Sequence, residues 1–87
     1  MKETPLTSNI SANIGRATQY ELEGNLKSEL MHLLFAVRDI TEMLKVYRAA
    51  RMSRSPTEWM DRPIAKRYAA TLHRISIRIC ELIEAGA

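Results

Sequence analysis

Apolar residues recur with heptad spacing in two segments of this chain, and this pattern constrains the fold more than any other feature. In both segments the apolar positions alternate in steps of three and four residues, which is the spacing of helices that pack lengthwise against other helices. The sequence therefore predicts an all-α fold. The first stripe consists of Leu26, Leu30, Leu33, Val37, Ile40, Leu44 and Tyr47, and the second of Ala65, Tyr68, Leu72, Ile75, Ile79 and Leu82.

The residues around these stripes predict a helical hairpin. A first, long helix is predicted over residues 18–52, with Gly24 as a weak point that costs ~1 kcal/mol relative to alanine. A proline-containing bend follows, because the residue before a proline avoids the α region. The second helix is predicted over residues 63–84, ending before Gly86.

Residues 1–17 are predicted to be a flexible or weakly helical N-terminal segment, and residues 18–87 a helical hairpin domain. Ile10, Ile14 and Ala17 have helical spacing, but a nearby glycine and asparagine have low helix propensity. The sequence leaves two alternatives for this segment: it docks on the hairpin, or it becomes ordered only on a partner.

The small size of the chain favours assembly. It has 87 residues and one cysteine, so no intrachain disulfide can support a small core. Residues 1–44 carry four Lys/Arg and six Asp/Glu, whereas residues 45–87 carry nine and four. Two hairpins packed antiparallel would bring the basic bend of one against the acidic end of the other. This predicts a homodimeric four-helix bundle, unless the charges are simply solvated.

Chemistry-bearing motifs are missing from the sequence. It contains no Ser-His-Asp arrangement, paired cysteines, glycine-rich phosphate loop or His-Glu-x-x-His pattern, and His32, His73 and Cys80 lack metal-ligand spacing. We therefore expect no enzyme activity, no cofactor and no metal.

A membrane span of ~18 apolar residues and the apolar core of a signal peptide are also lacking from the sequence. The single cysteine fits a reducing compartment, so we expect a cytoplasmic protein.

Binding of another protein is the function that the sequence favours. Phe35 and Ile77 lie outside the two apolar stripes. Apolar residues in such positions indicate an intermolecular interface, although single exposed apolar residues are also ordinary. Trp59 lies among arginines, a composition typical of interface hot spots, but it could equally close the hairpin core. We expect a regulator, inhibitor, adaptor or chaperone that occludes a partner's helix or acidic surface. The predicted partner-binding residues are Phe35, Arg48, Arg51, Arg54, Trp59 and Arg62.

Nucleic-acid binding by a dimeric regulator is the alternative. The basic bend and the second helix would supply contacts to phosphates, and the layout is similar to that of small plasmid-control RNA-binding hairpins and short secretion co-chaperones. This similarity is one of architecture, and no motif accompanies it. The net charge of only +3 weakens this alternative. Its candidate residues on the second helix are Lys66, Arg67, Arg74 and Arg78.

Overall fold

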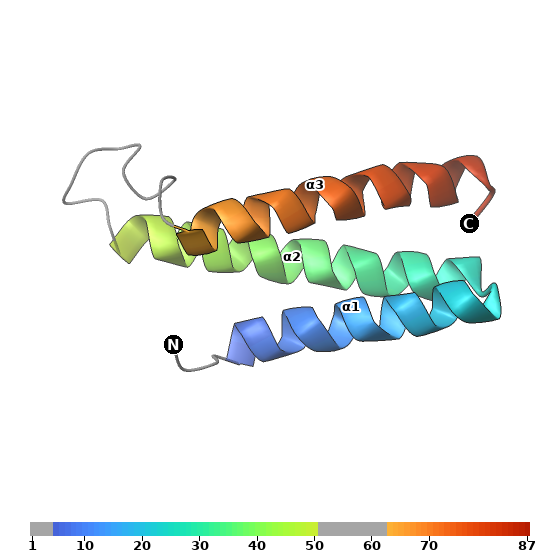
Figure 1. Cartoon of the computed structure of the whole chain (residues 1–87), viewed down its shortest axis with the longest axis horizontal. Coiled ribbons are helices and arrows are strands. Elements are labelled where there is room, and N and C mark those ends of the chain that lie inside the picture. Colours follow the sequence, from blue (N-terminus) through green and yellow to red (C-terminus); the bar gives the residue numbers. More distant parts are fainter. Residues whose placement is uncertain (1–4, 51–62) are drawn as a thin grey trace.

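Three helices make up the part of the chain that the computed structural model describes, which is residues 5–50 and 63–87. In Figure 1, α2 lies in the middle with α1 and α3 on either side, and successive helices run in opposite directions. The predicted all-α fold is confirmed, and α3 has the predicted bounds. The helices are α1 (Pro5–Glu23), α2 (Leu26–Ala50) and α3 (Pro63–Glu84).

The prediction of one continuous helix over residues 18–52 is wrong, because the chain turns at Gly24. Gly24 has a φ of 74°, in the left-handed region that glycine adopts without a Cβ penalty. Its amide donates to the carbonyl of Glu21 at 3.1 Å, and the amide of Asn25 donates to the carbonyl of Tyr20 at 2.9 Å. This pair of bonds is the Schellman motif that ends helices. Gly24 therefore terminates α1 instead of weakening a longer helix.

Asn25 begins α2 within the same turn. Its side-chain Oδ1 accepts a hydrogen bond from the amide of Ser28 at 3.2 Å, and its carbonyl accepts one from the amide of Glu29 at 3.0 Å. An asparagine in this position satisfies one of the free amides of the first helical turn. The Gly-Asn pair thus ends one helix and starts the next with no intervening loop.

Residues 5–23 dock on the hairpin as α1. This helix begins at Pro5 and runs across the predicted boundary between residues 17 and 18. Ile10 and Ala17 are buried against the hairpin. Of the two alternatives for this segment, the structure therefore shows docking on the hairpin. Each chain contributes three helices from its described residues, so two copies would bring at least six helices together, not four. The dimeric assembly itself stays a prediction.

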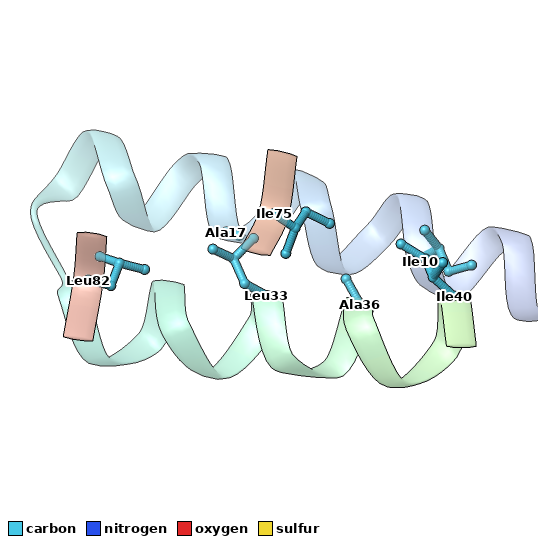
Figure 2. Close-up of a cluster of buried hydrophobic side chains, with 7 residues drawn as sticks. All are labelled: Ile10, Ala17, Leu33, Ala36, Ile40, Ile75 and Leu82. Carbon is cyan, nitrogen blue, oxygen red and sulfur yellow. The ribbon is translucent and has the colours of Figure 1, made fainter. Parts of the chain in front are cut away.

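The hydrophobic core runs along all three helices and draws on the described members of both predicted stripes. Every described member of the two stripes is buried or half-buried. In Figure 2, Ile10 and Ala17 of α1 lie beside α2 residues of the core. Small side chains, Ala17 and Ala36, are fully or nearly fully buried between α1 and α2. The buried cluster comprises Ile10, Ala17, Leu33, Ala36, Ile40, Ile75 and Leu82.

Candidate protein-binding surface

One side of α2 is left uncovered by α1 and α3. We call it the outer face of α2 and define it by Met31, Leu34, Phe35 and Arg38, which lie within roughly 100° of arc at about 100° per residue. Met31, Leu34 and Phe35 are 47 %, 49 % and 37 % exposed. They are three of the six large hydrophobic residues that are exposed in the described part of the chain. Apolar residues grouped in this way mark interaction sites more often than single ones do.

A row of aromatic rings connects the outer face to α1. The ring centroid of Tyr20 lies 5.2 Å from that of His32, and His32 meets the ring of Phe35 edge-on at 5.8 Å. His32 Nδ1 lies 2.9 Å from the carbonyl oxygen of Ser28. Because a carbonyl only accepts, Nδ1 carries the hydrogen in this bond. Phe35 is therefore held by a neighbour whose orientation is itself fixed.

Basic side chains border the apolar residues of the outer face. The guanidinium carbon of Arg38 lies 5.4 Å from the ring centroid of Phe35, a cation–π geometry. The Arg38 side chain is 72 % exposed and also approaches Asp39 at 3.4 Å. Lys27, Glu42 and Lys45 are exposed on the same side of α2, and none of them forms an ion pair within the described residues. The apolar anchors of the outer face are thus bordered by unpaired charges.

Ile77 differs from Phe35 in its surroundings. It is 51 % exposed on α3, but the residues one turn away are Cys80, which is small, and the polar His73, Arg74 and Glu81, all of them exposed. An isolated apolar residue among charges is ordinary protein surface. Of the two residues that the sequence placed outside the seams, only Phe35 lies within an apolar group.

Arg78 lies in an ion-pair cluster that joins all three helices. Its Nε and Nη2 donate to the two carboxylate oxygens of Glu29 at 2.7 and 3.0 Å, and Nε lies 3.4 Å from Glu21. Glu29 is only 1 % exposed, so this bidentate pair satisfies a buried charge. Hydrogen bonding to Glu29 raises the pKa of Arg78 despite an opposing desolvation effect. Arg78 is therefore occupied within the fold.

The other candidate nucleic-acid-binding residues of α3 remain exposed. Lys66, Arg67 and Arg74 point to solvent, and Arg74 Nη2 lies 3.4 Å from the hydroxyl of Thr71. With Arg78 held by two carboxylates, the predicted row of four basic residues provides three available cations. The nucleic-acid assignment of these residues stays a prediction.

Sequence reasoning missed two parts of this arrangement. Leu34 follows a buried stripe residue and was not recognised as part of a surface group, although it lies one turn from Met31 and Arg38. Glu29 and Arg78 both occupy the g position of their heptads. Residues at g positions form ion pairs between packed helices, so this shared position was the available signal.

Several predicted partner-binding residues lie outside the described residues. They are Arg51, Arg54, Trp59 and Arg62, together with the side chain of Arg48. Within the described ranges, no helix is long and apolar enough to cross a membrane, and no three His, Cys, Asp or Glu side chains are grouped to hold a metal ion. The cytoplasmic location and the lack of enzyme activity stay predictions.

Comparison with protein-family models, curated proteins and solved structures finds no match to this chain.

Proposed function

We propose that this chain is a small non-enzymatic regulator that binds another protein through the outer face of α2. It would act as an inhibitor, adaptor or chaperone by covering a helix or an apolar surface of that partner. The observation that carries the proposal is the grouping of Met31, Leu34 and Phe35 on one uncovered helix face. A helix that presents such a face is suited to pack against another helix.

The physical basis is the free energy released when this face is covered. Burial of apolar surface contributes roughly 25 cal/mol for each Å² removed from water. Phe35 is held by His32 on one side and Arg38 on the other, so little of its side-chain freedom remains to be lost. Rigid aromatic residues beside arginine are typical of the residues that contribute most to protein interfaces.

The charges around the face indicate the chemistry of the partner. Lys27, Arg38 and Lys45 border the apolar residues, with Glu42 as the one described acidic residue among them. A partner segment with an apolar stripe and flanking carboxylates would complement this border. Complementary charge contributes mainly to specificity and association rate, while the apolar anchors supply affinity.

Nucleic-acid binding is supported by fewer residues. Its predicted row on α3 includes Arg78, which the fold pairs with Glu29 and Glu21. Glu81 adds a further carboxylate on the same helix. A phosphate backbone would meet acidic side chains over this half of α3, which weakens its attraction.

A pull-down from native cytoplasm with matched surface variants tests the proposal. Leu34→Asp places a charge on the outer face, and Ile77→Asp places one at a residue of closely similar exposure on α3. Wild type and Ile77→Asp should retain a stoichiometric protein other than a second copy of this chain after nuclease treatment and in moderate salt, and Leu34→Asp should lose it. Circular dichroism checks that both variants keep the helical content of wild type.

Two results would contradict the proposal. Retention of the same protein by Leu34→Asp would show that the outer face is not the binding surface. Recovery of nucleic acid alone, lost steeply with salt, would favour the alternative, because displacement of counterions gives phosphate contacts a log-linear salt dependence.

A further inference from the structure

We infer that the outer face of α2 binds the same face of a second copy of this chain, with the two α2 helices antiparallel across a two-fold axis. The axis would pass between the levels of Leu34 and Phe35. This inference rests on the proposed function because it uses the same face. When no other partner is bound, a second copy of the chain occupies that face. A foreign helix would then compete with the second copy.

The positions of the exposed residues along α2 support this register. Met31 and Arg38 lie equally far from the midpoint between Leu34 and Phe35, and so do Lys27 and Glu42. In an antiparallel two-fold pair, residues equally far from the axis on opposite sides face each other. Leu34 would face Phe35 of the second copy. The contact from residue 27 to residue 42 would span roughly 22 Å at 1.5 Å per residue.

Charge complementarity selects a second copy in this orientation. Lys27 of each copy would face Glu42 of the other, so the symmetry forms two ion pairs from side chains that are exposed and unpaired in the single chain. A parallel arrangement would instead place Lys27 against Lys27 and Glu42 against Glu42. Like charges facing each other are unfavourable, so the same face favours the antiparallel pair.

The ends of the three-helix unit support the same orientation. The turn after α1 and the end of α3 lie at one end of the unit (Figure 1), where exposed Glu21, Glu23, Glu81 and Glu84 are found. The opposite end carries exposed Lys45, Lys66 and Arg67. Antiparallel copies bring the basic end of one chain towards the acidic end of the other.

Charge reversal tests this register by sedimentation equilibrium on the full chain. Lys27→Glu and Glu42→Lys should each raise the dimer dissociation constant by about tenfold, since each replaces two attractive surface pairs with two repulsive ones. The double variant Lys27→Glu/Glu42→Lys restores both pairs and should return to within about threefold of wild type. The control Arg74→Glu/Glu42→Lys has the same net charge, changes an exposed residue in the middle of α3 and restores neither pair, so it should stay about tenfold weaker.

A dimer that follows this pattern supports the inference. A chain that sediments as a monomer up to millimolar concentration would overturn it, and so would a dimer for which the double variant and its control behave alike. Neither result bears on the pull-down with Leu34→Asp, because capture of a foreign protein through the outer face needs no second copy. Failure of the dimer and failure of the proposed function are therefore distinguished.

Discussion

Replacing Gly24 by alanine tests the turn that separates α1 from α2. A Cβ at this position would meet no atom within 4 Å, so the substitution introduces no clash. Its effect comes from the backbone, which has a φ of 74°. An L-residue with a side chain costs roughly 1–2 kcal/mol in this left-handed conformation. The gain from a less flexible unfolded chain offsets part of this cost, by about 0.4–1 kcal/mol.

The net expectation for Gly24→Ala is a loss of about 1 kcal/mol of unfolding free energy. If the chain instead formed one helix through residue 24, the same substitution would stabilise it by about 1 kcal/mol, because alanine has the higher helix propensity. The two structures therefore predict opposite signs. For a domain of this size, 1 kcal/mol corresponds to a change of roughly 4–8 °C in Tm.

Gly15→Ala is the matched control within α1. A Cβ there also meets no atom within 4 Å, and its φ is not in the left-handed region. This variant should gain roughly 0.5–1 kcal/mol. Both variants are compared with wild type by urea unfolding followed by far-UV circular dichroism, at one fixed protein concentration because association shifts apparent stability. Stabilisation by Gly24→Ala would refute the turn.

Two further substitutions test the core and the ion pair. Leu82 is 1 % exposed, whereas its neighbour Ile83 is 60 % exposed. In urea unfolding, Leu82→Ala should therefore cost about 2–5 kcal/mol of unfolding free energy and Ile83→Ala about 0.5 kcal/mol or less. Equal losses would contradict the packing of α3. Glu29→Gln should lower the urea midpoint more than Glu23→Gln does, since only Glu29 is a buried partner of Arg78. The raised pKa of Arg78 means that its contribution is complete below the ordinary arginine pKa and is lost only as the pH rises through the raised value. The Glu29→Gln difference should therefore be constant through mildly alkaline pH, and a decline there would contradict the pairing.

The two apolar stripes that face the core could be predicted from the sequence, because each is defined by heptad spacing within a single helix. The heptad spacing identified every α2 and α3 residue of the buried cluster except Ala36. Pro63 and Gly86 marked the ends of α3. The end of α1 was missed because Gly24 was treated as a helix residue with low propensity. The pair Gly24-Asn25 carries both a C-terminal and an N-terminal helix signal, and these signals were available in the sequence.

The outer face could be predicted only in part. Phe35 was expected outside the seam, but the sequence does not show which sides of α2 its neighbours cover. Coverage depends on where α1 docks, and α1 offers only a few apolar residues, chiefly Ile10 and Ala17, to define that position. The ion pair of Glu29 with Arg78 depends likewise on the relative level of two helices that are separated by a long segment of chain.

Solvent exposure of methyl groups tests most directly the claim that the outer face of α2 pairs with a second copy of the chain. Met31, Leu34 and Ile77 have similar exposure in the single chain, at 47 %, 49 % and 51 %. A soluble paramagnetic probe relaxes exposed methyl groups, so measurements over a series of protein concentrations report which of the three become covered in the proposed dimer. We predict weaker relaxation at Met31 and Leu34 than at Ile77, with a smaller difference in Lys27→Glu at the same protein concentration. Equal relaxation of all three methyl groups at every concentration would contradict pairing of the chain through this face.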